Sequence, residues 1–162
     1  MIELKNVSQL DKMRTAGRIV AETLQLMKES VCDGITTGEL DRIAEEYIRK
    51  CGALPGFKGL YGFPATLCTS VNEEVVHGIP GLRQLKSGDI ISIDCGSLYK
   101  GYYGDATVSC GVGQICEEYQ NLLKVCEQSL MIGIDQARIG NRLYDISHAV
   151  QTYVESNGMS VV

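Results

Sequence analysis

Two stretches near the start of the chain carry apolar residues at three- and four-residue steps. The first runs from Ser8 to about Val31, and its apolar stripe comprises Met13, Ala16, Val20, Leu24, Met27 and Val31. The second runs from about Thr37 to Cys51, with a stripe of Leu40, Ile43, Ala44, Tyr47 and Ile48. This spacing is typical of amphipathic helices. Ser8 with Asp11, and Thr36 with Glu39, match the capping-box pattern at a helix start. We therefore predict two helices.

The middle of the chain changes to short apolar runs separated by turn residues. The segment Pro55 to Thr66 is rich in glycine and aromatic residues without either period, so it is predicted as a loop. Four strands are predicted after it, at Leu67–Val71, Glu74–Ile79, Asp89–Leu98 and Tyr102–Val112. Tyr99, Lys100 and Gly101 supply a hairpin turn between the last two strands.

Two further amphipathic helices are predicted, at Glu117–Ile132 and at Asn141–Ser156, with Asn141 as the N-cap. The second ends in Y-V-x-x-x-G, and the helix before Gly52 ends in Y-I-x-x-x-G. This match indicates either an internal repeat or a chance likeness between amphipathic helices. On the repeat interpretation, the first half spans 1–113 and is complete. Residues 114–162 are then the helix pair of an incomplete second half, in one α+β domain with an antiparallel sheet flanked by helices.

The composition of the chain argues against several classes of function. The formal charge is -5 with no basic run, which argues against nucleic acid binding. No apolar stretch approaches the roughly 20 residues that span a bilayer, and the first residues do not resemble a signal peptide, so we expect a cytoplasmic protein. The seven cysteines are odd in number and scattered, without C-x-x-C. We interpret them as small apolar residues and not as a zinc site or a disulfide framework.

Two aspartates stand out because Asp is depleted in strands. Asp94 lies within an apolar strand, and Asp105 lies in the returning strand. With a two- or four-residue hairpin loop, the prediction places Asp94 opposite Asp105. A three-residue loop would shift the register, and a bulge near Gly104 could restore it. Facing carboxylates repel, and a divalent cation would relieve that repulsion. The alternative is that one carboxyl is protonated or solvated at a sheet edge.

The chain has two histidines, in different contexts. His77 lies in E-E-V-V-H-G-I-P-G, where Gly78 and Pro80 restrict the backbone that follows. Its ring could donate a hydrogen bond to a substrate or to a developing oxyanion, or it could be an ordinary surface or core histidine. His148 lies between apolar helix positions and is interpreted as a helix residue without a function.

Together these segments resemble a known family. They are Cys68-T-S-V-Asn72-Glu73-Glu74-V-V-His77-Gly78-I-Pro80, then Gly88-Asp89-I-I-S-I-Asp94 and Gly101-Y-Y-Gly104-Asp105-A-Thr107. In order and spacing they resemble type I methionine aminopeptidases, which have the pita-bread metallopeptidase fold. The likeness extends from the first helix to Gly158.

The resemblance implies a role for each of six residues. Asp94 and Asp105 match two ligands of a divalent metal centre, with two ions (Co, Mn, Fe or Zn) in a complete site. His77 matches a histidine that contacts the substrate amide and assists catalysis. Phe57, Phe63 and Cys68 lie where the family lines its pocket for the methionine side chain. The implied reaction is removal of the N-terminal methionine from nascent polypeptides near the ribosome, with small second residues preferred.

The sequence departs from the family pattern at two places. Tyr103 stands where the family often has histidine, at a position that supplies no ligand. The family also takes one His and two Glu ligands, and a further catalytic His, from a region that follows the equivalent of Val162. We therefore expect the 162 residues to be inactive alone and prone to self-association. The alternative hypothesis is a non-catalytic homologue, or a half-domain that binds a partner.

Overall fold

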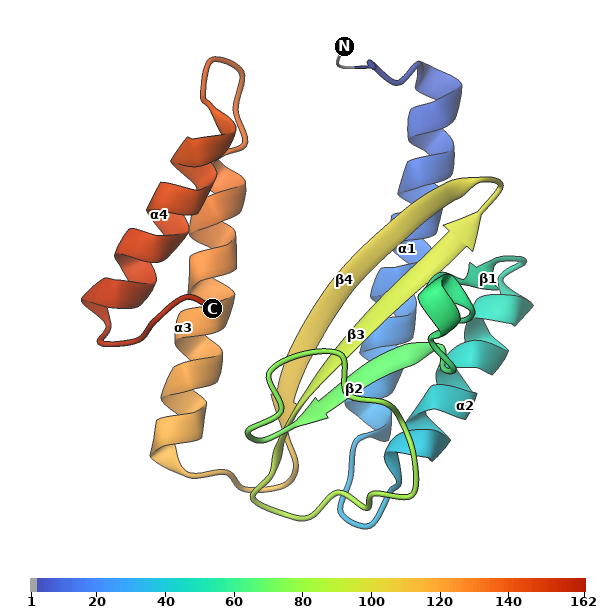
Figure 1. The fold of residues 1–162 in the computed structure, drawn as a ribbon, viewed down its shortest axis with the longest axis vertical. Helices are drawn as coiled ribbons and strands as arrows, with labels where there is room; N and C mark the ends of the chain where they lie inside the picture. The colour runs from blue at the N-terminus through green and yellow to red at the C-terminus, as the bar shows by residue number, and fades with distance from the viewer. Residues whose placement is uncertain (1–2) are drawn as a thin grey trace. The chain divides into compact units, whose positions relative to one another are not determined.

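A computed structural model describes residues 3–162, which form two compact units (Figure 1). The first unit ends at Ile115, and the second is Cys116–Val162. The elements of the first unit are α1 (Val7–Ser30), α2 (Thr37–Lys50), β1 (Leu54–Pro55), the 3-10 turn η1 (Leu60–Gly62), β2 (Leu67–Val71), β3 (Ile90–Tyr99) and β4 (Tyr102–Gly111). The second unit contains α3 (Glu117–Gln136) and α4 (Leu143–Ser156). None of these helices is long and apolar enough to cross a bilayer.

Both predicted helices of the first unit are confirmed, with one correction to their caps. α1 begins after Asn6, whose side chain accepts from the Gln9 backbone N–H while the Gln9 side chain accepts from Asn6. The predicted Ser8 cap is therefore wrong by two residues, because Asn at the N-cap and Gln at the third position serve equally well. The predicted capping box of Thr36 and Glu39 at the start of α2 is confirmed.

The sheet is built around β3. β4 pairs with it along one side, while β2 and then the short β1 pair with it along the other, all antiparallel. Alternate β3 residues Ile91, Ile93 and Cys95 join the core formed with α1 and α2 and are fully buried. Because side chains alternate along a strand, Asp94 and Gly96 project from the opposite face. That face, away from the two helices, carries the candidate site.

The predicted strand at Glu74–Ile79 is wrong. Residues 72–89 form an irregular connection between β2 and β3, interrupted only by an isolated bridge from Gln84 to Thr36. Val75, Val76 and Ile79 are 65%, 66% and 63% exposed, so these apolar side chains do not pack in the core. We call residues 72–85 the His77 loop. The segment predicted as a loop, Pro55 to Thr66, also contains the end of β1 and the η1 turn.

In the second unit, α3 extends beyond its predicted end and α4 begins at Leu143, after Arg142 and not Asn141 as the N-cap. Close packing of this pair depends on Gly133, because a Cβ there would lie 2.8 Å from a methyl carbon of Val150.

Helices α2 and α4 end in the same way. Each has 14 residues, and each is followed by a glycine with φ of 74°. After each glycine, a backbone N–H donates back over the same span at 3.2 Å, from Ala53 to Ile48 and from Met159 to Val154. Glycine C-caps of this kind are common among helices, so the internal repeat stays a prediction.

Candidate metal and substrate site

The aspartate pair lies on the open face of the sheet, in a different register from the predicted one. Lys100 and Gly101 form a two-residue turn, both with positive φ (49° and 84°), and Tyr99 pairs with Tyr102. Asp94 is therefore opposite Thr107, and Asp105 is opposite Gly96. The predicted direct pairing of the two aspartates is wrong by two residues. A shift of two keeps both on one face, as diagonal neighbours about 7–8 Å apart.

The electrostatics of the pair favour a bound cation. Oδ1 of Asp94 is buried and has no hydrogen-bond partner within residues 3–162. Partial desolvation raises the pKa of Asp105, and the nearby Asp94 charge raises it further. An unpartnered carboxylate oxygen beside a second carboxylate is an arrangement that a divalent cation would satisfy. Over the described part of the chain, no group of three or more His, Cys, Asp or Glu side chains could hold a metal ion.

A cavity of about 560 Å³ adjoins the aspartates. The structure brings all six residues singled out in the sequence to its wall: Phe57, Phe63, Cys68, His77, Asp94 and Asp105. The sequence patterns did not indicate its remaining lining residues, which are Leu60, Tyr61, Gly62, Pro64 and Ile79. The wall therefore combines apolar side chains with two carboxylates and one imidazole, as is typical of small-molecule sites.

Cys68 lies in β2 directly opposite Asp94 and is 6% exposed. Burial, together with the charges of Asp94 and Asp105, raises the pKa of the Cys68 thiol to about 11. At neutral pH the group is therefore a protonated thiol. It contributes a small polarizable surface to the cavity and is a poor nucleophile, because the thiolate is the reactive form.

His77 is held in an unusual backbone conformation. Its φ is 60°, in the left-handed region that non-glycine residues seldom adopt. The next residue, Gly78, donates its N–H to Oγ of Ser70 at 3.2 Å and accepts from the Thr69 N–H at 2.8 Å. A Cβ at Gly78 would overlap the Thr69 carbonyl oxygen, so only glycine fits against β2 here. The side chain of His77 is exposed and lines the cavity.

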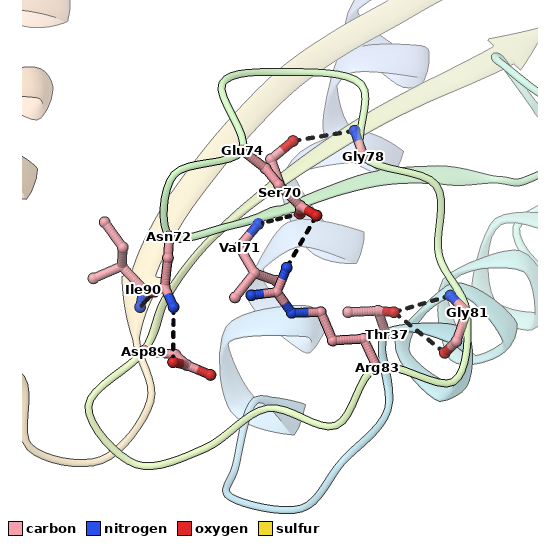
Figure 2. A network of polar contacts seen from close by, with 10 residues as sticks. All are labelled: Thr37, Ser70, Val71, Asn72, Glu74, Gly78, Gly81, Arg83, Asp89 and Ile90. Carbon is pink, nitrogen blue, oxygen red and sulfur yellow. Dashed lines mark hydrogen bonds and ion pairs between the residues drawn. The ribbon is translucent and has the colours of Figure 1, made fainter.

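Figure 2 shows how the His77 loop is closed at its base. One carboxylate oxygen of Glu74 accepts from the Val71 N–H at 2.8 Å, and the other accepts from Nη1 of Arg83 at 2.9 Å. The ion pair joins the outgoing and returning arms of the loop. Nearby, Asn72, with φ of 57°, donates to Asp89 and accepts from the Ile90 N–H.

The returning arm of the loop is held by the start of α2. The N–H groups of Thr37 and Gly38 donate to the carbonyls of Arg83 and Gly81, at 3.0 and 2.8 Å. Oγ1 of Thr37 accepts from the Gly81 N–H at 2.9 Å (Figure 2). Helix N-termini have N–H groups without intrahelical partners, and here the loop carbonyls satisfy two of them. No periodicity in the sequence indicates these contacts, because they join residues far apart in the chain, 44 positions in the case of Thr37 and Gly81.

His148 lies elsewhere, on α4 in the second unit. It is exposed, and its ring stacks on Tyr144 with centroids 6.1 Å apart. It therefore sits on a helix surface, next to an aromatic residue of its own helix.

The chain is similar to one family of metallopeptidases and to its bacterial members. The model of metallopeptidase family M24 matches residues 11–162. A methionine aminopeptidase of Clostridium perfringens is 58% identical over all 162 residues of this chain, which correspond to 65% of that protein. Methionine aminopeptidase 1 of Bacillus subtilis is 53% identical over 162 residues, again 65% of its length. The chain thus spans slightly less than two thirds of these relatives.

Solved structures show the same fold. The crystal structure of a Thermotoga maritima methionine aminopeptidase matches with a TM-score of 0.98 at 39% identity, over 100% of this chain and 66% of that one. A prolidase from Pyrococcus furiosus matches with a TM-score of 0.86 at 18% identity, over 96% of this chain and 44% of that one, which shows a shared fold alone. The predicted pita-bread fold is confirmed by these matches.

Proposed function

The chain belongs to metallopeptidase family M24, and on this basis we propose that it carries the first part of an active site that removes N-terminal methionine from polypeptides. One observation supports this above the others. A carboxylate pair, a histidine and an apolar wall with a thiol converge on one cavity of about 560 Å³. The proposed setting is the cytoplasm, with nascent chains leaving the ribosome as substrates.

Asp94 and Asp105 would hold the divalent metal. Hard and borderline ions accept carboxylate oxygens, so Co, Mn, Fe and Zn all fit this donor pair. A complete site would hold two ions. When bound, such ions polarise a substrate carbonyl and lower the pKa of water.

The apolar part of the cavity would take the methionine side chain. Phe57 and Phe63 supply aromatic surface, and the Cys68 thiol adds a sulfur contact that suits a thioether. His77, on the rim, would donate a hydrogen bond to the substrate amide and to the oxygen on which charge develops. Peptides with a small second residue would fit best.

Two carboxylates are fewer than the three protein ligands that a catalytic metal site usually has. We therefore expect the 162 residues alone to bind a divalent ion weakly and to release no free methionine. The remaining ligands would come from a region equivalent to the unmatched third of the relatives.

A chimera tests the proposal. The 162 residues replace the matching part of the Clostridium perfringens relative, and free methionine released from a Met-Gly peptide is measured with Mn²⁺ or Co²⁺. The chimera should release methionine, and its Asp105→Ala variant should not. A folded chimera without activity, or an Asp105→Ala chimera that stays active, would contradict the proposal.

A further inference from the structure

Gly96 occupies a central position on the open face of the sheet. It follows Asp94 by two residues in β3 and pairs with Asp105 in β4. It is buried, because the ring of Phe57 covers it. A Cβ at Gly96 would lie 2.5 Å from Cε1, 2.9 Å from Cδ1 and 3.0 Å from Cζ of that ring. The ring thus occupies the space that any side chain at position 96 would need.

A second glycine brings the ring to this position. After β1 ends at Pro55, the Gly56 N–H donates to the Gly96 carbonyl at 2.7 Å. A Cβ at Gly56 would lie 2.8 Å from the Gly96 carbonyl carbon, so the two backbones approach this closely only because residue 56 has no side chain. The ring of Phe57, the next residue, thereby lies over Gly96, which pairs with Asp105 in the sheet.

We propose that Gly96 is a specificity-determining residue, because it lets the Phe57 ring lie close to the sheet and the position of that ring sets the depth of the cavity. Phe57 lines the cavity, whereas Gly96 lies beneath the ring and does not line it. The assignment of a methionine side chain as the occupant of the cavity rests on the proposed function.

A methyl group at position 96 would force a movement with a defined direction. The nearest ring carbon must move from 2.5 Å to at least the ordinary contact distance of 3.4 Å. A methyl group on Gly96 would project from the sheet against the ring and push the ring away from the sheet. Because the ring lines the cavity, the wall of the cavity would move with it. A shallower cavity excludes long side chains before short ones. The position of the Phe57 ring over Gly96 therefore helps to distinguish methionine from alanine.

The test compares Gly96→Ala with the double variant Gly96→Ala/Phe57→Leu, which removes the ring that the new methyl group meets. The substitutions are made in the chimera described above, which supplies the remaining ligands. The probe is free L-methionine in the presence of Mn²⁺, followed by NMR titration of its labelled methyl group. Gly96→Ala should weaken binding about tenfold, in the range that one methylene has in an apolar pocket. The double variant should return to within about threefold of Phe57→Leu alone. Gly17→Ala is the control, because a Cβ there meets nothing within 4 Å.

Gly96→Ala with unchanged affinity, or a double variant that binds more than about threefold more weakly than Phe57→Leu alone, would overturn the inference. Urea unfolding of the unsubstituted protein, Gly96→Ala, Phe57→Leu and the double variant separates this result from failure of the proposed function. If Gly96→Ala and Phe57→Leu are energetically coupled but the unsubstituted chimera binds no methionine, the proposed function fails while the placement of the Phe57 ring by Gly96 stands. If the effects of the two substitutions on the free energy of unfolding are additive, the claim that Gly96 positions the Phe57 ring is refuted.

Discussion

The sharpest prediction concerns Gly78→Ala, because the structure gives a reason for glycine there that is independent of catalysis. The added Cβ would overlap the Thr69 carbonyl oxygen. That oxygen belongs to β2, whose residues from Leu67 to Val71 are all buried, so the His77 loop must move instead. Movement of the loop breaks the hydrogen bonds from Gly78 to Ser70 and from Thr69 to Gly78.

Each such hydrogen bond contributes a net 0.5–1.5 kcal/mol or so. Losing both should therefore lower the free energy of unfolding by about 1–3 kcal/mol. Urea unfolding followed by circular dichroism measures this, with an unchanged m-value showing that the transition is the same. Labelling the two histidines with ¹³C gives a local readout, because the His77 resonance should shift while the His148 resonance serves as a reference.

Gly81→Ala is the matched control. Gly81 lies in the same loop, neither glycine has a positive φ, and a Cβ at Gly81 meets nothing within 4 Å. The two substitutions therefore differ in available space and not in backbone strain. If Gly78→Ala unfolds within about 0.5 kcal/mol of Gly81→Ala, and the His77 resonance stays in place, the assignment of Gly78 as the anchor of the loop is refuted.

Three further predictions concern electrostatics and local structure. Asp105→Asn should stabilise the metal-free chain by at most about 1 kcal/mol above the raised pKa of Asp105. This gain should disappear as pH falls through that pKa, because protonation of Asp105 removes the same repulsion; a gain that grows toward low pH in urea unfolding would contradict the assignment. Asn72→Ala should cost about 2–3 kcal/mol in urea unfolding, since it loses two hydrogen bonds and places alanine at φ of 57°; a cost under about 0.5 kcal/mol would argue against it. Iodoacetamide at pH 8 should modify exposed Cys32 well before buried Cys68, whose pKa is raised to about 11, and mass spectrometry showing equal rates would count against that environment.

The sequence predicted the parts of the fold that depend on local pattern. The four helices and three of the four predicted strands appear near their expected positions, because periodicity and caps act within a few residues. Asp94 stood out for the same reason, as a carboxylate in an otherwise apolar strand. Its register to Asp105 was misplaced, because it depends on the backbone angles of Lys100 and Gly101.

The His77 loop shows where local pattern fails. Val75, Val76 and Ile79 have strand-like composition, but the Glu74 side chain accepts the Val71 N–H at the end of β2. The left-handed conformations of Asn72 and His77 then turn the chain away from the sheet. The contacts that hold the loop come from distant residues at the start of α2, which no window of sequence brings together.

The most direct test is Mn²⁺ binding to the 162-residue chain, measured as loss of the free-ion EPR signal, with Asp94→Asn and Asp105→Asn compared against Asp11→Asn. Asp11 is the matched control because it is an exposed carboxylate of α1, on the other face of the sheet, where it pairs with Arg14 at 2.8 Å. We predict weak binding that either Asp94→Asn or Asp105→Asn abolishes and Asp11→Asn preserves. Equal binding by all four chains would contradict the claim that Asp94 and Asp105 form the metal-binding pair.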